Sequence, residues 1–165
     1  MRRYRHITDE RKEYIEGITK KLRSEYPSSP GIDFNLLANG LDTVFLKTGK
    51  IGGSYAARIS GTDYVVKAKG FISRAEAYET AHEFGHVVLH NLENKLSVTA
   101  EEDEADYFAE KLTGIGSSLK DRMLINLDAS LRILRHPVKM FRYAFRIDKK
   151  EKEDLKISLA SYEHS

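Results

Sequence analysis

The stretch His82-Glu-Phe-Gly-His86 decides how the rest of this chain is interpreted. On a helix, residues four apart lie one above the other on the same face, so the two imidazoles can reach a single metal ion. The carboxylate of Glu83 then lies close to that ion, where it can take a proton from metal-bound water. The stretch therefore predicts a hydrolytic zinc site. Because so short a pattern can recur by chance, the prediction also depends on the surrounding sequence.

A hydrolytic zinc site usually has three protein ligands and one open position for water. The third ligand has to come from outside the motif, and a predicted helix over residues 100–112 supplies acidic side chains. Glu102 and Asp106 are four apart and share one face of that helix. This suggests Glu102 as the third ligand and Asp106 as the acceptor of the other N–H of a ligand histidine. Glu104 lies on a different face, and Glu101 would serve only if the helix had a different phase.

The predicted reaction is metal-assisted hydrolysis. Zinc lowers the pKa of bound water toward roughly 7, and Glu83 takes the proton and passes it to the leaving amine. An electrophilic partner for the tetrahedral oxyanion is expected, and the sequence offers Tyr78, Tyr107, His90 and His136. A fourth ligand at His90 would close the open coordination position. We therefore expect His90 to be a hydrogen-bonded, partly buried histidine.

The competing interpretation makes residues 82–86 a polar helix face and Glu102 part of a solvated acidic face. Two features favour the metal site. The motif lies in the middle of a strong amphipathic helix, and residues 93–110 carry seven acidic residues against one lysine. Gly85 costs about 1 kcal/mol of helix stability relative to alanine, which makes sense if another backbone or the substrate passes close to it.

Periodicity predicts an α+β fold. A small antiparallel three-stranded meander is expected, with strands over 43–46, 55–59 and 64–68. Helices are predicted over 8–25, 33–38, 73–91, 100–112 and 119–135, residues 141–148 fit a strand or a helix, and 149–161 fit a closing helix. Residues 1–115 are expected to form the domain that holds the site, and 116–165 a mainly helical extension packed on it.

Composition indicates an ordinary protein of 165 residues with 41% hydrophobic and 32% charged residues. The absence of cysteine excludes disulfides and thiolate zinc sites. The N-terminus lacks the apolar stretch of a signal peptide, and no run approaches the ~18 apolar residues of a membrane span. We therefore expect a cytoplasmic protein with no membrane association.

Residues 132–150 carry seven basic residues against one acid, with aromatic residues between them. Such a segment could contact nucleic acid or a membrane, or dock an acidic partner protein. The alternating pattern is more typical of apolar side chains that pack inward while arginines face water. We therefore do not expect nucleic acid to be the partner.

The residues resemble those of the ImmA/IrrE metallopeptidases of bacteria, phages and mobile elements. The resemblance rests on residues 74–90, which include His82-Glu-Phe-Gly-His86, and on Glu102-x-x-Ala-Asp-x-Phe-Ala109. It covers about residues 8–112 and implies a zincin-like fold with His82, His86 and Glu102 as zinc ligands and Glu83 as the catalytic acid/base. After Ala109 the family usually continues through Leu-Leu-x-Pro, whereas this chain has Glu-Lys-Leu-Thr-Gly-Ile-Gly116.

Members of that family typically cleave, or inactivate by contact, a helix-turn-helix repressor encoded nearby, which derepresses a mobile element or a stress response. The resemblance thus implies a zinc endopeptidase with a specific protein substrate, and manganese is an alternative metal because such sites accept several divalent ions. The alternative function is a metal-stabilised protein that sequesters a regulator without turnover.

Overall fold

A computed structural model describes residues 4–28, 31–90 and 98–135 of the chain. The chain divides into two compact units, residues 1–128 and 129–165, and the fold below is that of the first unit. Predictions for His136, for residues 141–148 and 149–161, and for most of the basic segment 132–150 fall outside the described residues. The packing of residues 129–165 of the predicted extension on the first domain stays a prediction.

The described residues form an α+β fold of five helices and short strands, which confirms the predicted class. The helices are α1 (Asp9–Glu25), α2 (Phe34–Gly40), α3 (Ser73–His90), α4 (Val98–Thr113) and α5 (Leu119–Arg135). The strands are β1 (Pro27–Ser28), β2 (Gly31–Ile32), β3 (Val44–Ile51), β4 (Tyr55–Ile59) and β5 (Thr62–Lys69). Helix starts follow local chemistry, since the side chains of Thr8 and Asp33 accept backbone amides at the first turns of α1 and α2.

The three-stranded sheet is mixed, and the predicted antiparallel meander is wrong. β4 and β5 form the expected antiparallel hairpin through a tight turn in which Ser60 and Gly61 both have positive φ. β3, however, pairs with β5 in parallel, so the strand order is β3-β5-β4. The physical reason is burial: β5 carries the buried run with Val65 and Val66, which favours the central position, whereas β3 and β4 are more exposed.

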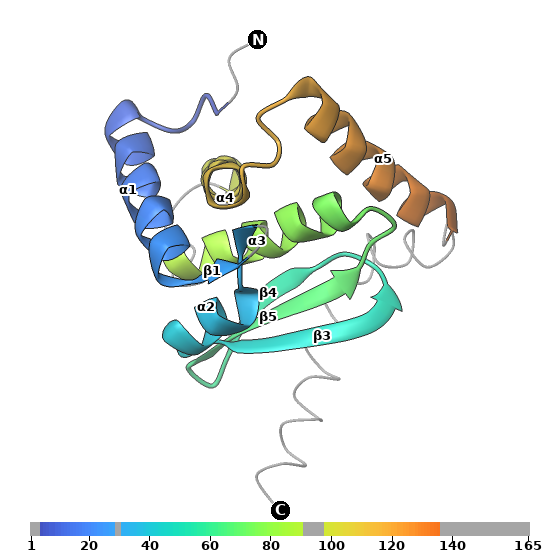
Figure 1. Cartoon of the computed structure of the whole chain (residues 1–165), viewed down its shortest axis with the longest axis horizontal. Coiled ribbons are helices and arrows are strands. Elements are labelled where there is room, and N and C mark those ends of the chain that lie inside the picture. Colours follow the sequence, from blue (N-terminus) through green and yellow to red (C-terminus); the bar gives the residue numbers. More distant parts are fainter. Residues whose placement is uncertain (1–3, 29–30, 91–97, 136–165) are drawn as a thin grey trace, which may run out of the picture. The chain divides into compact units, whose positions relative to one another are not determined.

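Helix α3 lies between the sheet and α4, and α1 packs on α4 (Figure 1). Phe84 anchors the sheet side of α3. Its ring is fully buried and stacks on Phe34 at 5.7 Å between centroids, with Phe45 at 5.6 Å. On the α4 side, a Cβ added at Gly85 would come within 3.0 Å of the Cα of Ala105. This is the close backbone approach that a glycine in the motif predicts.

Two acidic residues of α5 hold the connection between β5 and α3. The buried carboxylate of Asp128 accepts the backbone N–H groups of Phe71 and Ile72, each at 2.6 Å. Arg74 in the first turn of α3 pairs with Asp121 at 2.7 Å. Because 47 or more positions separate these partners, helical periodicity gave no sign of them. Over the described residues, no helix is both long and apolar enough to cross a membrane.

Candidate metal centre

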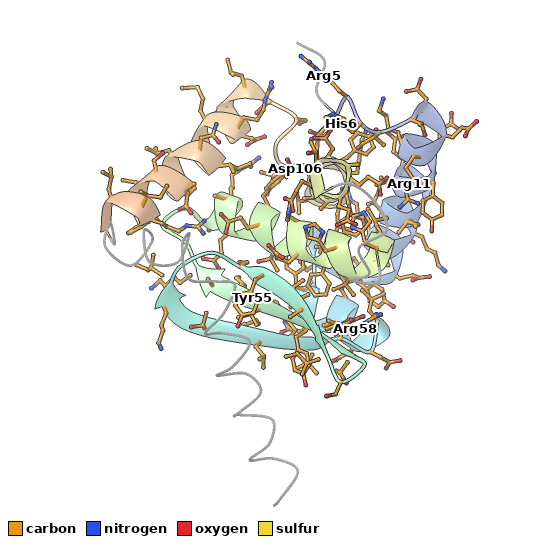
Figure 2. All side chains as sticks on the ribbon, turned by 180° about the vertical axis from the view of Figure 1, so that it is seen from behind. Arg5, His6, Arg11, Tyr55, Arg58 and Asp106 are labelled. Carbon is orange, nitrogen blue, oxygen red and sulfur yellow. The ribbon has the colours of Figure 1, made fainter. Side chains whose placement is uncertain are left out.

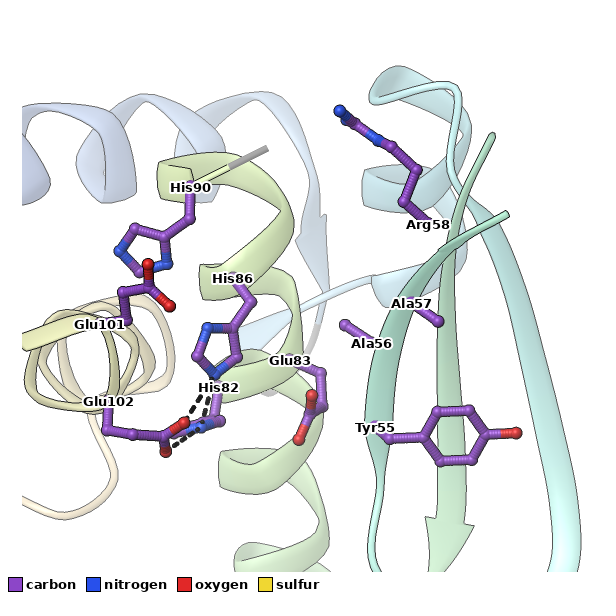
Figure 3. Close-up of a pocket in the computed structure, with 10 residues that line it drawn as sticks. All are labelled: Tyr55, Ala56, Ala57, Arg58, His82, Glu83, His86, His90, Glu101 and Glu102. Atoms are coloured by element: carbon purple, nitrogen blue, oxygen red, sulfur yellow. Dashed lines mark hydrogen bonds and ion pairs between the residues drawn. The ribbon is translucent and has the colours of Figure 1, made fainter. Parts of the chain in front are cut away.

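The structure brings together the three residues that the sequence predicts as metal ligands. Nε2 of His82 lies 3.1 Å from Nε2 of His86 and 3.3 Å from Oε2 of Glu102. Nε2 of His86 lies 3.5 Å from Oε1 of Glu102. Both histidines come from successive turns of α3, and Glu102 reaches them from the start of α4 (Figure 3). The packing of α3 against α4 therefore brings the three side chains together.

These separations fit a tetrahedral metal ion. Ligand atoms held about 2.0–2.1 Å from such an ion are separated from one another by roughly 3.3–3.4 Å. The three distances between the ligand atoms bracket that value. The donor set of two imidazoles and one carboxylate is also the one that hydrolytic zinc sites use. Among the described residues, this is the group of histidines and acids that can hold a metal ion.

The chain matches no known protein family, no curated protein and no solved structure. The metal assignment therefore rests on the geometry of the three ligands and on the side chains around them.

Asp106 takes the position predicted for it. Its Oδ1 lies 2.9 Å from Nδ1 of His82, the nitrogen that points away from the other ligands. This contact fixes the ring and its tautomer, as carboxylates behind ligand histidines commonly do. The hydroxyl of Tyr78 donates to the same oxygen at 3.0 Å. Tyr78 therefore orients Asp106, which in turn orients His82.

The tyrosines predicted as oxyanion stabilisers have other partners. The hydroxyl of Tyr78 donates to Asp106, as described above. The hydroxyl of Tyr107 donates to Glu16 of α1 at 2.5 Å, and Lys111 pairs with the same carboxylate. Neither ring lines the pocket at the ligands. Tyr107 is buried against α1 because residue 107 lies on the face of α4 that packs there. The third named candidate, His136, is outside the described residues.

The pKa values of the two histidines are shifted in opposite directions. Burial lowers the pKa of His82, but hydrogen bonds to Asp106 and Glu102 outweigh it and bring this pKa to about 10. Burial and the charge of His82 lower the pKa of His86 to about 4. The hydrogen bond from His82 holds the pKa of Glu102 below its usual value. One imidazole is therefore charged and the other neutral, as two rings in contact require.

Glu83 occupies the opposite wall of the site, between α3 and β4 (Figure 3). Burial raises the pKa of its carboxyl to about 7, against the lowering effects of the His82 charge and of a hydrogen bond from the backbone N–H of Ala56. That hydrogen bond ties the carboxylate to β4. Glu83 thus takes no part in the ligand triangle but lies beside it, as a proton acceptor must.

A pocket of about 450 Å³ opens onto the ligands, a size within the usual range of binding sites. One wall is β4, from Tyr55 to Arg58, and the other is made by α3 and the start of α4. Seen from behind, Tyr55 and Arg58 lie on the sheet side of α3 and Asp106 on the α4 side (Figure 2). Arg58 is paired with Asp63 at 2.6 Å, and the remaining charged groups of the lining are histidines and glutamates.

A buried cluster behind the pocket was not predicted. Glu104 is 4% exposed and binds Arg11 of α1 through both oxygens, at 2.8 and 2.9 Å. Oε2 of Glu104 also lies 3.0 Å from Nε2 of His90, which confirms that His90 is a hydrogen-bonded, partly buried histidine. Burial raises the pKa of Glu104, but the hydrogen bonds to Arg11 and His90 lower this pKa by more than burial raises it. The net shift is therefore downward. Arg11 is 93 positions from Glu104, and no local pattern links them.

Proposed function

We propose that this protein is a zinc-dependent peptidase of the zincin type, with His82, His86 and Glu102 as the metal ligands and Glu83 as the catalytic acid/base. The observation that carries the proposal is the spacing of the three ligand atoms, 3.1 to 3.5 Å, beside the half-buried carboxylate of Glu83, which is not a ligand. Manganese is an alternative metal, because affinity alone does not select the ion that is used.

Each residue of the site has a chemical role in this proposal. A divalent ion at the three ligands would polarise the scissile carbonyl and acidify a water molecule. Glu83 accepts the proton of the attacking water and passes it to the leaving nitrogen, for which its position beside β4 and its raised pKa are suited. Asp106 holds His82 in the tautomer that leaves Nε2 free for a metal.

The substrate we propose is an extended segment of a protein. β4 is an edge strand of the sheet, and four consecutive residues of it, Tyr55 to Arg58, line the pocket. An edge strand offers backbone N–H and C=O groups to which an extended peptide can pair. The resemblance to the ImmA/IrrE metallopeptidases supports a helix-turn-helix repressor as the protein that is cut, with derepression of a mobile element or a stress response as the result.

The test begins with the gene next to this one, which the proposal expects to encode a small helix-turn-helix repressor. Purified repressor and protein are incubated with Zn²⁺, and cleavage is followed by mass spectrometry. Glu83→Gln should bind Zn²⁺ nearly as wild type and lose cleavage by about 10²–10⁴-fold, because the amide cannot accept the proton. Glu79→Gln, one turn earlier on α3, is the matched control and should cut at nearly the wild-type rate.

Two results would reject the peptidase. One is a repressor that stays intact with wild-type protein and Zn²⁺. The other is a Glu83→Gln variant that relieves repression as fully as wild type in a reporter assay. The second result would establish sequestration without turnover as the function.

A further inference from the structure

His90 ends α3 one turn beyond His86, and its surroundings fix where its protons lie. The side chain is 6% exposed, and its Nε2 is 3.0 Å from Oε2 of Glu104. Glu104 is already paired with Arg11 through both oxygens, so it is an ionised acceptor and the nitrogen of His90 must donate. With Nε2 donating to Glu104, the other ring nitrogen of the neutral imidazole carries no hydrogen. Its Nδ1 is therefore a hydrogen-bond acceptor.

This acceptor has no partner. Nδ1 of His90 is buried and forms no hydrogen bond within the part of the chain that the structure describes. Buried polar atoms are nearly always hydrogen-bonded, so an unpaired one needs an explanation. His90 also lines the pocket that contains the metal ligands, so the unpaired nitrogen belongs to the surroundings of the site.

The neighbouring ring, that of His86, has a nitrogen that can donate a hydrogen bond. Nε2 of His86 faces His82 and Glu102, where it would bind a metal. With Nε2 used in this way, the proton of the neutral ring is on Nδ1. No hydrogen bond to that N–H is formed among the residues described. The two rings follow one another on the side of α3 that faces α4, with centroids 5.5 Å apart and planes tilted by 48° (Figure 3).

We propose that His90 is a positioning residue of the metal site: when a metal is bound, its Nδ1 accepts the Nδ1–H of His86 and so holds the His86 ring in place. The inference rests on the metal site of the proposed function, and it assigns a hydrogen-bond acceptor to the Nδ1–H of His86. Asp106 does the same for His82. Glu104 and Arg11 then act behind His90 by fixing its tautomer.

Two substitutions separate this role from a merely structural one. Gln at position 90 can place its amide N–H where Nε2 of His90 was, which keeps the bond to Glu104 and loses the acceptor at Nδ1. Asn can place its carbonyl oxygen where Nδ1 was, which keeps the acceptor and loses the bond to Glu104. The measurements are the Zn²⁺ affinity by chelator competition, the visible spectrum of the Co²⁺-loaded protein, and the Tm of the metal-free protein.

We expect the two variants to change different quantities. His90→Gln should lose about 10–100-fold in Zn²⁺ affinity and alter the Co²⁺ spectrum, as loss of a partner behind a ligand commonly does, and its metal-free Tm should stay near that of wild type. His90→Asn should melt at a lower temperature without metal and keep Zn²⁺ affinity within a few fold of wild type.

The inference is overturned if His90→Gln binds Zn²⁺ as wild type does, or if affinity simply follows Tm in both variants. Glu101 lines the same pocket and its charge acts on His86, so Glu101→Ala is the control for a competing acceptor. A large loss of affinity in Glu101→Ala with none in His90→Gln would assign the acceptor to Glu101. Failure of wild-type protein to bind Zn²⁺ or Co²⁺ is a different result, which rejects the proposed function and this inference together.

Discussion

At the scale of single residues, each position of His82-Glu-Phe-Gly-His86 meets a different neighbour. The two histidines face Glu102 of α4, and Glu83 faces the backbone of β4. Phe84 enters an aromatic cluster on the sheet side, and Gly85 lets the backbone of α4 approach. The meeting of His82 and His86 on one face was predictable because i, i+4 spacing fixes which side chains share a helix face.

The roles of other residues were not predictable in the same way. Tyr78 and Tyr107 were candidates only because a phenol can donate a hydrogen bond, and their distance from the site along the chain does not say which carboxylate each one meets. The contact of Glu104 with Arg11 joins α4 to α1 across 93 positions, so it depends on how the helices pack. Periodicity assigns a face to each helix but does not identify the neighbour of that face.

The raised pKa of His82 predicts that metal binding releases a proton. A ligand imidazole must give up the proton on its coordinating nitrogen, and His82 is protonated up to a pH of about 10 in the metal-free protein. His86, with a pKa of about 4, and the ionised Glu102 have no proton to give up near neutral pH. The apparent Zn²⁺ affinity should therefore rise at least tenfold per pH unit between roughly pH 7 and pH 9, and more steeply where the metal-bound water also gives up a proton.

Chelator competition at several pH values measures this slope, and calorimetry in two buffers with different heats of ionisation counts the protons. The slope should flatten above a pH of about 10, where His82 is already neutral. An affinity that stays constant from pH 7 to pH 9 would contradict the assigned protonation of His82.

At the scale of elements, the site is the product of one helix pair and one edge strand. α3 and α4 pack closely enough for side chains from both to meet at the ligands, and β4 closes the pocket from the other side. Amphipathic periodicity located α1, α3, α4 and α5 to within a few residues. The order of the strands could not be predicted because alternation identifies a strand without identifying its neighbours. The burial of β5 accounts for its central position.

Close packing of α3 on α4 predicts the effect of Gly85→Ala. The new methyl group would meet the Cα of Ala105 at 3.0 Å and its carbonyl oxygen at 3.3 Å, and backbone atoms cannot easily move away. Overpacking typically costs about 1–3 kcal/mol, more than the about 1 kcal/mol of helix propensity that alanine gains. We expect a lower free energy of unfolding in urea and weaker Zn²⁺ binding, because Glu102 would be displaced from the histidines.

Gly17→Ala in α1 is the matched control. An added Cβ at this exposed helical position has no neighbour within 4 Å, so alanine should raise stability by roughly 0.5–1 kcal/mol. Equal effects of the two substitutions would show that helix propensity, and not the contact of α3 with α4, governs position 85.

At the scale of the whole molecule, the described part of the first unit covers α3 with the sheet on one side and with α4 on another. Its sheet side is closed by the aromatic cluster, α4 is backed by α1, and the pocket at the ligands remains open between β4 and the start of α4. Composition and motif spacing predicted a domain over residues 1–115 around one metal site, with residues 116–165 as a mainly helical extension. The resemblance to the ImmA/IrrE metallopeptidases, which the sequence motifs suggest, supplies the proposed substrate.

The most direct test of the metal centre is the stoichiometry and affinity of Zn²⁺ binding to the full chain. Wild-type protein, stripped with a chelator and titrated by calorimetry, should bind one ion per chain and gain Tm on binding. Glu102→Ala should lose that affinity by orders of magnitude, whereas Asp103→Ala, a neighbouring acid whose carboxylate contacts His6, should bind as wild type does. Wild-type protein that takes up no Zn²⁺, or a Glu102→Ala variant that binds it as tightly as Asp103→Ala, would contradict the account.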